Sequence, residues 1–189
     1  MATTPTDAAS AHVLDAAERM FLAQGYAGAR LRDLAADLGI QPASLYHHAP
    51  GGKRHLWDRV VGRALARHRD GLRAAAGHAG PDLRAQLVAM AMWLLSQPAL
   101  NVATLAAGDS GALSEDLYEA LMVPVADALR EAQACGQARG GVSPDLFAGV
   151  FVSAIAGLGP ADRAGSLPRP AADVARDVVD LLLSGAELR

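Results

Sequence analysis

Hydrophobic residues recur at intervals of three and four positions along most of the chain, which is the pattern of amphipathic helices. In the N-terminal third, this pattern predicts helices over residues 7–24, 31–38, 42–48 and 53–76. Glycine and proline clusters separate further predicted helices over residues 82–96, 99–107, 114–137, 144–158 and 170–184. The high alanine content also favours helix over sheet. We therefore expect an all-α protein.

The clearest interruption of the pattern is the segment GHAGPD at residues 77–82, where two glycines meet a proline suited to the first turn of a helix. We therefore predict an N-terminal domain over residues 1–54, extended by a connecting helix to about residue 76. A second helical domain is predicted over residues 77–189. The chain of 189 residues is long enough to bury a proper core.

The sequence also indicates a compartment. Cys135 is the single cysteine, so an internal disulfide is impossible and a reducing environment is favoured. The N-terminal stretch lacks the basic and apolar regions of a signal peptide, and no apolar run approaches the roughly 18 residues of a membrane span. We expect a cytoplasmic protein that does not contact the membrane.

Residues 31–53, LRDLAADLGIQPASLYHHAPGGK, contain two short predicted helices separated by a glycine turn. A helix-turn-helix unit has this arrangement, because its first helix braces a second one that enters the major groove of DNA. The residues predicted to pack the two helices together are Leu34, Leu38, Ile40 and Leu45. An exposed tip would remain, formed by Gln41, Pro42, Ala43 and Ser44.

The second short helix ends in an aromatic residue and two histidines, Tyr46, His47 and His48. Side chains leaving the groove at this end would meet phosphate oxygens, to which a hydroxyl or an imidazole N–H can donate. Lys53, at the start of the next helix, adds a positive charge to a place where backbone N–H groups favour anions. The charge balance gives modest support to a polyanionic partner, since residues 1–80 carry a net charge of +3 and the remainder −6.

The stretch VLDAAERMFLAQGYAGARLRDLAADLGIQPASLYHHAPGGKRHLWDRVV, residues 13–61, resembles the TetR family of bacterial regulators. A helix ending in Gly-Tyr, followed by RDLA, LGI and LYHH, falls in the family's order and spacing. The resemblance implies that Arg32 reaches DNA. It also implies base-facing positions at Gln41, Ala43 and Ser44, and phosphate contacts by Tyr46, His48 and Lys53.

The chain departs from the family's pattern at four places within this stretch. There is no Ser or Thr cap near Arg30, and Gln41 replaces the commoner small hydroxyl cap. Ala49 stands where a phenylalanine is usual. The turn PGGK is one residue longer than the common one.

The resemblance also implies a ligand-responsive regulator, in its simplest form a repressor released from a palindromic operator by a small apolar molecule. The second domain would dimerise and enclose the ligand, and residues 144–158 and 170–184 have the broad apolar faces of a dimer seam. The candidate apolar lining comprises Met90, Trp93, Leu94, Leu105, Tyr118, Leu121, Met122 and Phe147. Gln97, Asn101 and Thr104 are the candidate polar groups of the same pocket.

Other classes of function find less support. The sequence contains no Gly-x-Ser-x-Gly and no His-Glu-x-x-His motif, so we do not expect an enzyme or catalytic residues. Adjacent helical residues point about 100° apart, which makes one metal ion shared by His47 and His48 difficult. We expect no metal and no cofactor. A helical protein-interaction or small-molecule-binding protein without specific DNA binding stays open as the alternative.

Overall fold

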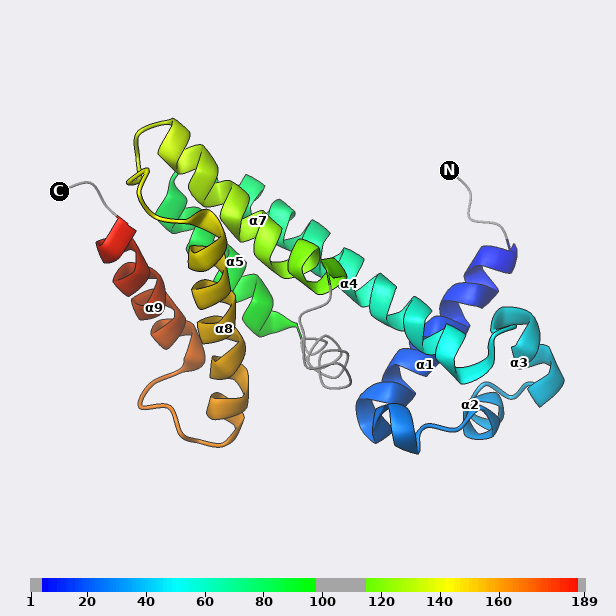
Figure 1. Cartoon of the computed structure of the whole chain (residues 1–189). Coiled ribbons are helices and arrows are strands. Elements are labelled where there is room, and N and C mark those ends of the chain that lie inside the picture. The colour runs from blue at the N-terminus through cyan, green and yellow to red at the C-terminus, as the bar shows by residue number, and fades with distance from the viewer. Residues whose placement is uncertain (1–4, 98–114, 187–189) are drawn as a thin grey trace. The chain divides into compact units, whose positions relative to one another are not determined.

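The computed structural model describes residues 5–97 and 115–186, and its elements there are all α-helices (Figure 1). In chain order they are α1 (Pro5–Gly28), α2 (Leu31–Asp37), α3 (Pro42–His48), α4 (Gly52–Ala79), α5 (Leu83–Ser96), α7 (Glu115–Ala134), α8 (Pro144–Arg163) and α9 (Ala171–Ala186). The expected all-α class is confirmed. The helix predicted over residues 99–107 lies outside the described residues, together with Asn101, Thr104 and Leu105.

Packing divides the chain into two compact units, and the division falls inside α4, between Ala64 and Leu65. The segment at residues 77–82, where the sequence predicts a domain boundary, forms the end of α4 and the short connection to α5. Asp82 caps α5 there, because its side chain accepts a hydrogen bond from the Ala85 N–H at 2.7 Å.

The N-terminal unit packs α1, α2, α3 and the first half of α4 around one apolar core. Its largest buried side chains include Phe21, Leu34, Leu45, Leu56 and Val60, each at most 1% exposed. Arg63 on α4 adds ion pairs to Asp15 and Glu18 on α1, both at 2.7 Å. The unit therefore holds the two short helices against α1 and α4 on a continuous core.

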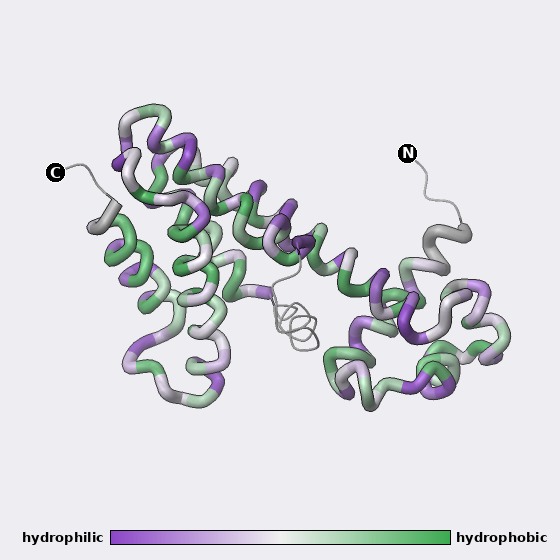
Figure 2. Tube along the Cα trace, viewed as in Figure 1, coloured by the Kyte–Doolittle hydropathy of each residue, from purple (hydrophilic) through white to green (hydrophobic). Residues whose placement is uncertain are grey.

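The C-terminal unit is a helical bundle in which α8 packs against α5, α7 and α9. Figure 2 shows hydrophobic positions recurring along these helices, and the fully buried large side chains of the unit include Leu87, Met90, Leu129, Phe151 and Ile155. On the surface, the Arg84 guanidinium of α5 donates to both Asp180 oxygens of α9 at 2.6 and 2.9 Å. This pairing holds the pKa of the Asp180 carboxyl below its usual value.

Helix α8 is longer than the sequence pattern predicts, because it continues through Gly159 and Pro160 to Arg163 instead of ending near residue 158. Proline removes one helical hydrogen bond without ending this helix. The helix ends at Arg163 and is capped by Ala164, and Gly165 follows with a φ of +64°, in the left-handed region that stops helices.

By length and composition, α8 also qualifies as a membrane-spanning helix, contrary to the expectation from the sequence. Phe147, Phe151 and Ile155 on its inner face are nevertheless buried against neighbouring helices. A core helix of a bundle passes the same test of length and composition, and we assign α8 to the bundle.

Candidate functional site

The helices α2 and α3 form a helix-turn-helix unit with a four-residue connection. Leu38 caps α2, and Gly39 reverses the chain with a φ of +63°, which an L side chain adopts only with strain. The Ile40 N–H then donates to the Ala35 carbonyl oxygen at 3.0 Å, and α3 begins with Pro42 in its first turn. The glycine turn and the proline start therefore stand where the sequence predicts them.

One face of α3 is anchored in the core and the other is free of it. Leu45 is 1% exposed, whereas Gln41, Pro42, Ala43 and Ser44 are all exposed. Tyr46 is 54% exposed although it is a large aromatic residue. His47 is exposed as well, and the side chain of His48 lies outside the described part of the chain. The exposed side of α3 is thus a compact polar tip with one aromatic residue beside it.

Helix α2 carries the predicted cation of the bracing helix. The side chain of Arg32 is 80% exposed, and its guanidinium lies 3.9 Å from the Asp33 carboxylate, which is a weak surface pairing. Arg30, the N-cap residue of α2, is exposed too and is not among the predicted DNA residues. Neither Arg30 nor Gln41 makes a side-chain capping bond, in agreement with the missing hydroxyl caps in the sequence. Arg30 is therefore a second exposed arginine at the start of the bracing helix. Its position directly before the predicted helix is the signal in the sequence that could have added it to the candidates.

Lys53 is placed differently from the other predicted DNA residues. Its ammonium donates to the carbonyl oxygens of Tyr26 at 2.8 Å and Ala29 at 3.1 Å, and it lies 4.5 Å from the centre of the Tyr26 ring. These contacts direct the charge of Lys53 toward the backbone between α1 and α2.

The C-terminal unit contains a groove of about 310 Å³ among α4, α5 and α7. Its lining comprises Arg73, Ala76, Gly77, Gln86, Met90, Pro124, Asp127, Ala128 and Glu131. Met90 is the one residue of this lining that is also a ligand candidate by sequence. Two carboxylates and one guanidinium make the groove more polar than the predicted apolar pocket.

The other described ligand candidates lie in the core of the bundle. Leu94, Leu121, Met122 and Phe147 are each at most 5% exposed, and Gln97 is half-buried. Trp93, also half-buried, packs edge-to-face on His68 of α4 with 5.5 Å between ring centres. An apolar set is therefore present, but it serves the packing of the bundle in this structure.

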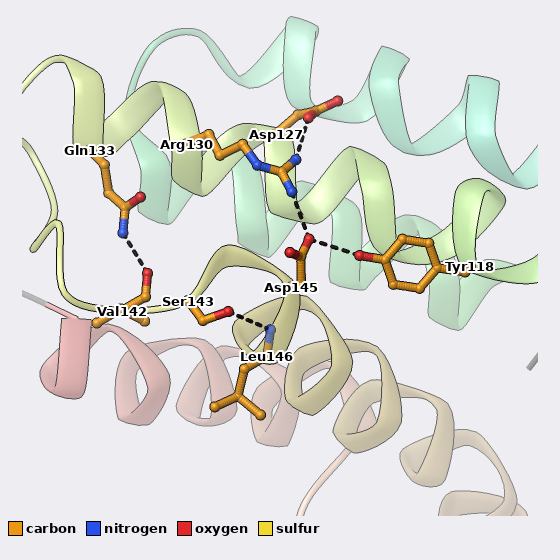
Figure 3. Close-up of polar contacts among 8 residues, drawn as sticks. All are labelled: Tyr118, Asp127, Arg130, Gln133, Val142, Ser143, Asp145 and Leu146. Atoms are coloured by element: carbon orange, nitrogen blue, oxygen red, sulfur yellow. Dashed lines mark hydrogen bonds and ion pairs between the residues drawn. The ribbon is translucent and has the colours of Figure 1, made fainter. Parts of the chain in front are cut away.

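Tyr118 takes part in a polar cluster at the junction of α7 and α8 (Figure 3). Its hydroxyl donates to Asp145 at 2.8 Å, and Arg130 reaches the same carboxylate oxygen at 2.6 Å. The hydrogen bond to Asp145 raises the pKa of the Tyr118 hydroxyl above its usual value. Arg130 also donates to Asp127 at 2.8 Å, so this cluster is linked to a lining residue of the groove.

Comparison with known proteins identifies the N-terminal unit. Residues 13–60 match the family model for bacterial regulatory proteins of the tetR family. The HTH-type transcriptional regulator LmrA of Bacillus subtilis (strain 168) is 46% identical over 44 residues, a match that spans 23% of this chain and 23% of that relative.

Solved structures agree with the fold of the whole chain. A TetR-family transcriptional regulator from Pectobacterium atrosepticum superposes with a TM-score of 0.72 at 21% identity, covering 99% of both chains. A proposed transcriptional regulator from Saccharomonospora viridis, solved in complex with choline, gives a TM-score of 0.75 at 22% identity and covers 96% of this chain and 98% of its own. Residues 13–60 therefore form an N-terminal domain of the tetR family of bacterial regulatory proteins, and the chain shares the fold of these solved structures.

Proposed function

We propose that this chain is a cytoplasmic, dimeric transcriptional repressor that binds a palindromic DNA operator and is released by a small molecule. The observation that carries the proposal is the form of α3, with Leu45 in the core and the tip Gln41–Ser44 exposed. A short helix of this kind fits the major groove, and its exposed small and polar residues can approach base edges.

The proposed contacts divide into two kinds. Gln41, Pro42, Ala43 and Ser44 face the bases, where they read sequence. Arg32, Tyr46, His47 and His48 meet the phosphates, where they position the protein without reading sequence. The exposure of Arg32 and Tyr46 supports this division, because both side chains already lie outside the core and can reach a phosphate without disturbing it.

Replacing Tyr46 by Ala is expected to weaken binding to all DNA sequences by about tenfold, because one hydrogen bond to phosphate and the aromatic contact are lost in each subunit. Replacing Gln41 or Ser44 by Ala is expected to change the preferred base at particular positions, by about 1–3 kcal/mol of discrimination at a position that makes a good base contact. Mobility shifts and base-by-base binding profiles measure the two effects. Tyr46→Phe, which keeps the ring, isolates the part played by the hydroxyl. A Tyr46→Ala variant that changes base preference instead would contradict the assignment.

The dimer is proposed to form through α8 and α9. Leu146 and Val150 on α8 are 68% and 46% exposed, and Leu181 on α9 is 72% exposed. Leu146 and Val150 are four residues apart and so share one face of α8, while half-exposed Val174 and Val178 extend the apolar side of α9 toward Leu181. Such faces are typical of two-fold helical interfaces, and a symmetric dimer presents two reading heads to inverted half-sites.

The effector is proposed to be a small, largely apolar molecule bound within residues 85–151. Met90, Leu94 and Met122 supply adaptable apolar side chains there, and Met90 lines the groove. The groove also holds two carboxylates, Glu131 and Asp127, of which Asp127 is paired with Arg130, so a small organic cation is a second class of effector, and the structural neighbour solved with choline supports including that class. A complete switch from bound to released needs about 5.5 kcal/mol of differential affinity between the two conformations.

A thermal-shift screen with apolar compounds and with choline is expected to identify a stabilising ligand of one class. By reciprocity, operator DNA must then weaken that ligand's binding by the same factor by which the ligand weakens DNA binding. Calorimetry with and without operator measures this factor. Equal ligand affinities in the two titrations would identify a passenger and not an inducer.

The alternative is a helical interaction or ligand-binding protein that does not bind DNA specifically. A mobility shift that is absent at low salt would favour it, since protein–DNA binding by phosphate contacts strengthens as salt is lowered.

A further inference from the structure

The Lys53 ammonium contacts three groups of its own chain, two backbone carbonyls and one aromatic ring. Two of its N–H groups donate to the carbonyl oxygens of Tyr26 and Ala29, at 2.8 and 3.1 Å, and the ring of Tyr26 lies 4.5 Å from its nitrogen. Lys53 is half-buried, and it reaches these groups across 27 and 24 positions of sequence. Neutral carbonyl oxygens therefore occupy two of the three donors of this ammonium, and one donor is left for any other acceptor.

The two carbonyls lie at the connection between α1 and α2. Gly25 has a non-helical backbone with a φ of +67°, so the regular part of α1 stops there and Tyr26 and Ala29 follow the break. The last turn of α1 carries no basic residue. Lys53 brings a positive charge to these two carbonyl oxygens from the start of α4.

Aromatic packing ties the same two segments together. Trp57, one turn after Lys53 on α4, packs edge-to-face on Tyr26 with 5.4 Å between ring centres and on Phe21 with 4.9 Å. The start of α4 therefore contacts the end of α1 through the Lys53 ammonium and through the Trp57 ring. Ala29 is the last residue in these contacts, and α2 begins two residues later at Leu31.

We propose that Lys53 is a positioning residue that fastens the α1–α2 connection to the start of α4, and thereby sets the placement of the helix-turn-helix, in place of binding a DNA phosphate. This inference rests on the proposed DNA-binding function for its consequence but not for its geometry. The contact makes the first turn of α4 and the entry to α2 move together. A displacement of α4 then reaches the DNA-reading helices through this residue.

The test compares Lys53→Met with Arg54→Met in the full-length protein. Both variants remove one positive charge at adjacent positions of α4, but the Arg54 side chain is 73% exposed and pairs with Asp58 at the surface. Hydrogen exchange of backbone amides over residues 26–35 is measured without DNA. Operator affinity is measured from about 50 to 200 mM salt, the range over which phosphate contacts are resolved.

Lys53→Met is expected to speed amide exchange over residues 26–35 at least tenfold and to weaken operator binding about tenfold, without changing the salt dependence. Arg54→Met is expected to leave the exchange unchanged. A lost phosphate contact in each subunit would instead reduce the slope of log affinity against log salt by about 1.8. That reduction, or unchanged exchange over residues 26–35, would overturn the proposal.

The exchange measurement separates this inference from the proposed function, because it requires no DNA. If the unmodified protein binds no operator, the proposed function fails, while faster exchange in Lys53→Met still supports the fastening contact. If Lys53→Met does not fold, the same measurements are made on Lys53→Gln, which removes the charge but keeps an amide donor near the two carbonyls. Exchange in Lys53→Gln equal to that of the unmodified protein, with a reduced salt slope, would again contradict the proposal.

Discussion

Leu181→Glu is expected to convert the proposed dimer into a monomer and to remove operator binding. Leu181 is 72% exposed on α9, so a glutamate there is solvated in the isolated protomer and does not disturb its core. In the proposed interface, two-fold symmetry would bury two such carboxylates, which costs several kcal/mol for each unpaired charge. We expect the dimer dissociation constant to rise at least about 100-fold, and operator affinity to fall by about 10²–10⁴ as the two heads become independent.

Sedimentation and mobility shifts measure the two effects together. Ala74→Glu is the matched control, since it adds the same charge at an exposed position of α4, outside the proposed seam. Phe151 is unsuited to this test although it lies on α8, because it is fully buried within the protomer and a charge there would report on folding. A Leu181→Glu protein that stays dimeric at micromolar concentration would show that α9 lies outside the interface.

Gly71→Ala is expected to destabilise the C-terminal unit by about 2 kcal/mol, even though alanine is the better helix former. A Cβ at Gly71 would lie 2.0 Å from Cζ2 and 2.2 Å from Cε2 of the Trp93 indole, far inside contact distance. Moving the ring away would break its edge-to-face packing on His68, which lies on the same helix as Gly71. Thermal unfolding should shift downward by roughly 4–8 °C.

Gly62→Ala provides the control for helix propensity. Gly62 is exposed in the same helix, and an added Cβ there would meet nothing within 4 Å, so the substitution is expected to stabilise the protein by about 0.5–1 kcal/mol. The double variant Gly71→Ala, Trp93→Phe should recover part of the loss, because a smaller ring relieves the overlap. Equal stability of Gly71→Ala and the unmodified protein would mean that Trp93 does not pack on α4.

The sequence predicts the helix-turn-helix well because each of its features is local. Gly39 reverses the chain, Pro42 begins α3, and Leu45 points inward, all as the spacing of residues 31–48 indicates. The tip residues follow once Leu45 is placed, since the helical period leaves their side of α3 free.

Helix ends are predicted less well, because several glycines and prolines compete as stop signals. In α8, the sequence pattern makes Pro160 part of a break, whereas the helix passes through it to Arg163, and Gly165 beyond the cap adopts the left-handed conformation. In α4, Gly77 lies within the helix, which ends at Ala79. One sequence does not say which glycine adopts the left-handed conformation, because that choice depends on the packing of the neighbouring turns.

The pattern of the sequence does not predict which side chains meet over long distances along the chain. Lys53 matches a phosphate-binding position of the family, yet its ammonium meets carbonyls more than twenty residues away. Tyr118 is a pocket candidate by its size and polarity, yet its hydroxyl bonds Asp145 across the α7–α8 junction. In both cases the side chain's partner is set by how helices distant in sequence come together.

The central claim, specific DNA binding by a symmetric dimer, is tested most directly by selecting bound duplexes from a random DNA pool with the full-length protein. We expect enrichment of one motif made of two inverted half-sites, because two copies of the α3 tip related by a two-fold axis read the same bases on opposite strands. Enrichment of a single half-site would contradict the dimer, and a pool that stays random after repeated rounds would contradict the DNA-binding function itself.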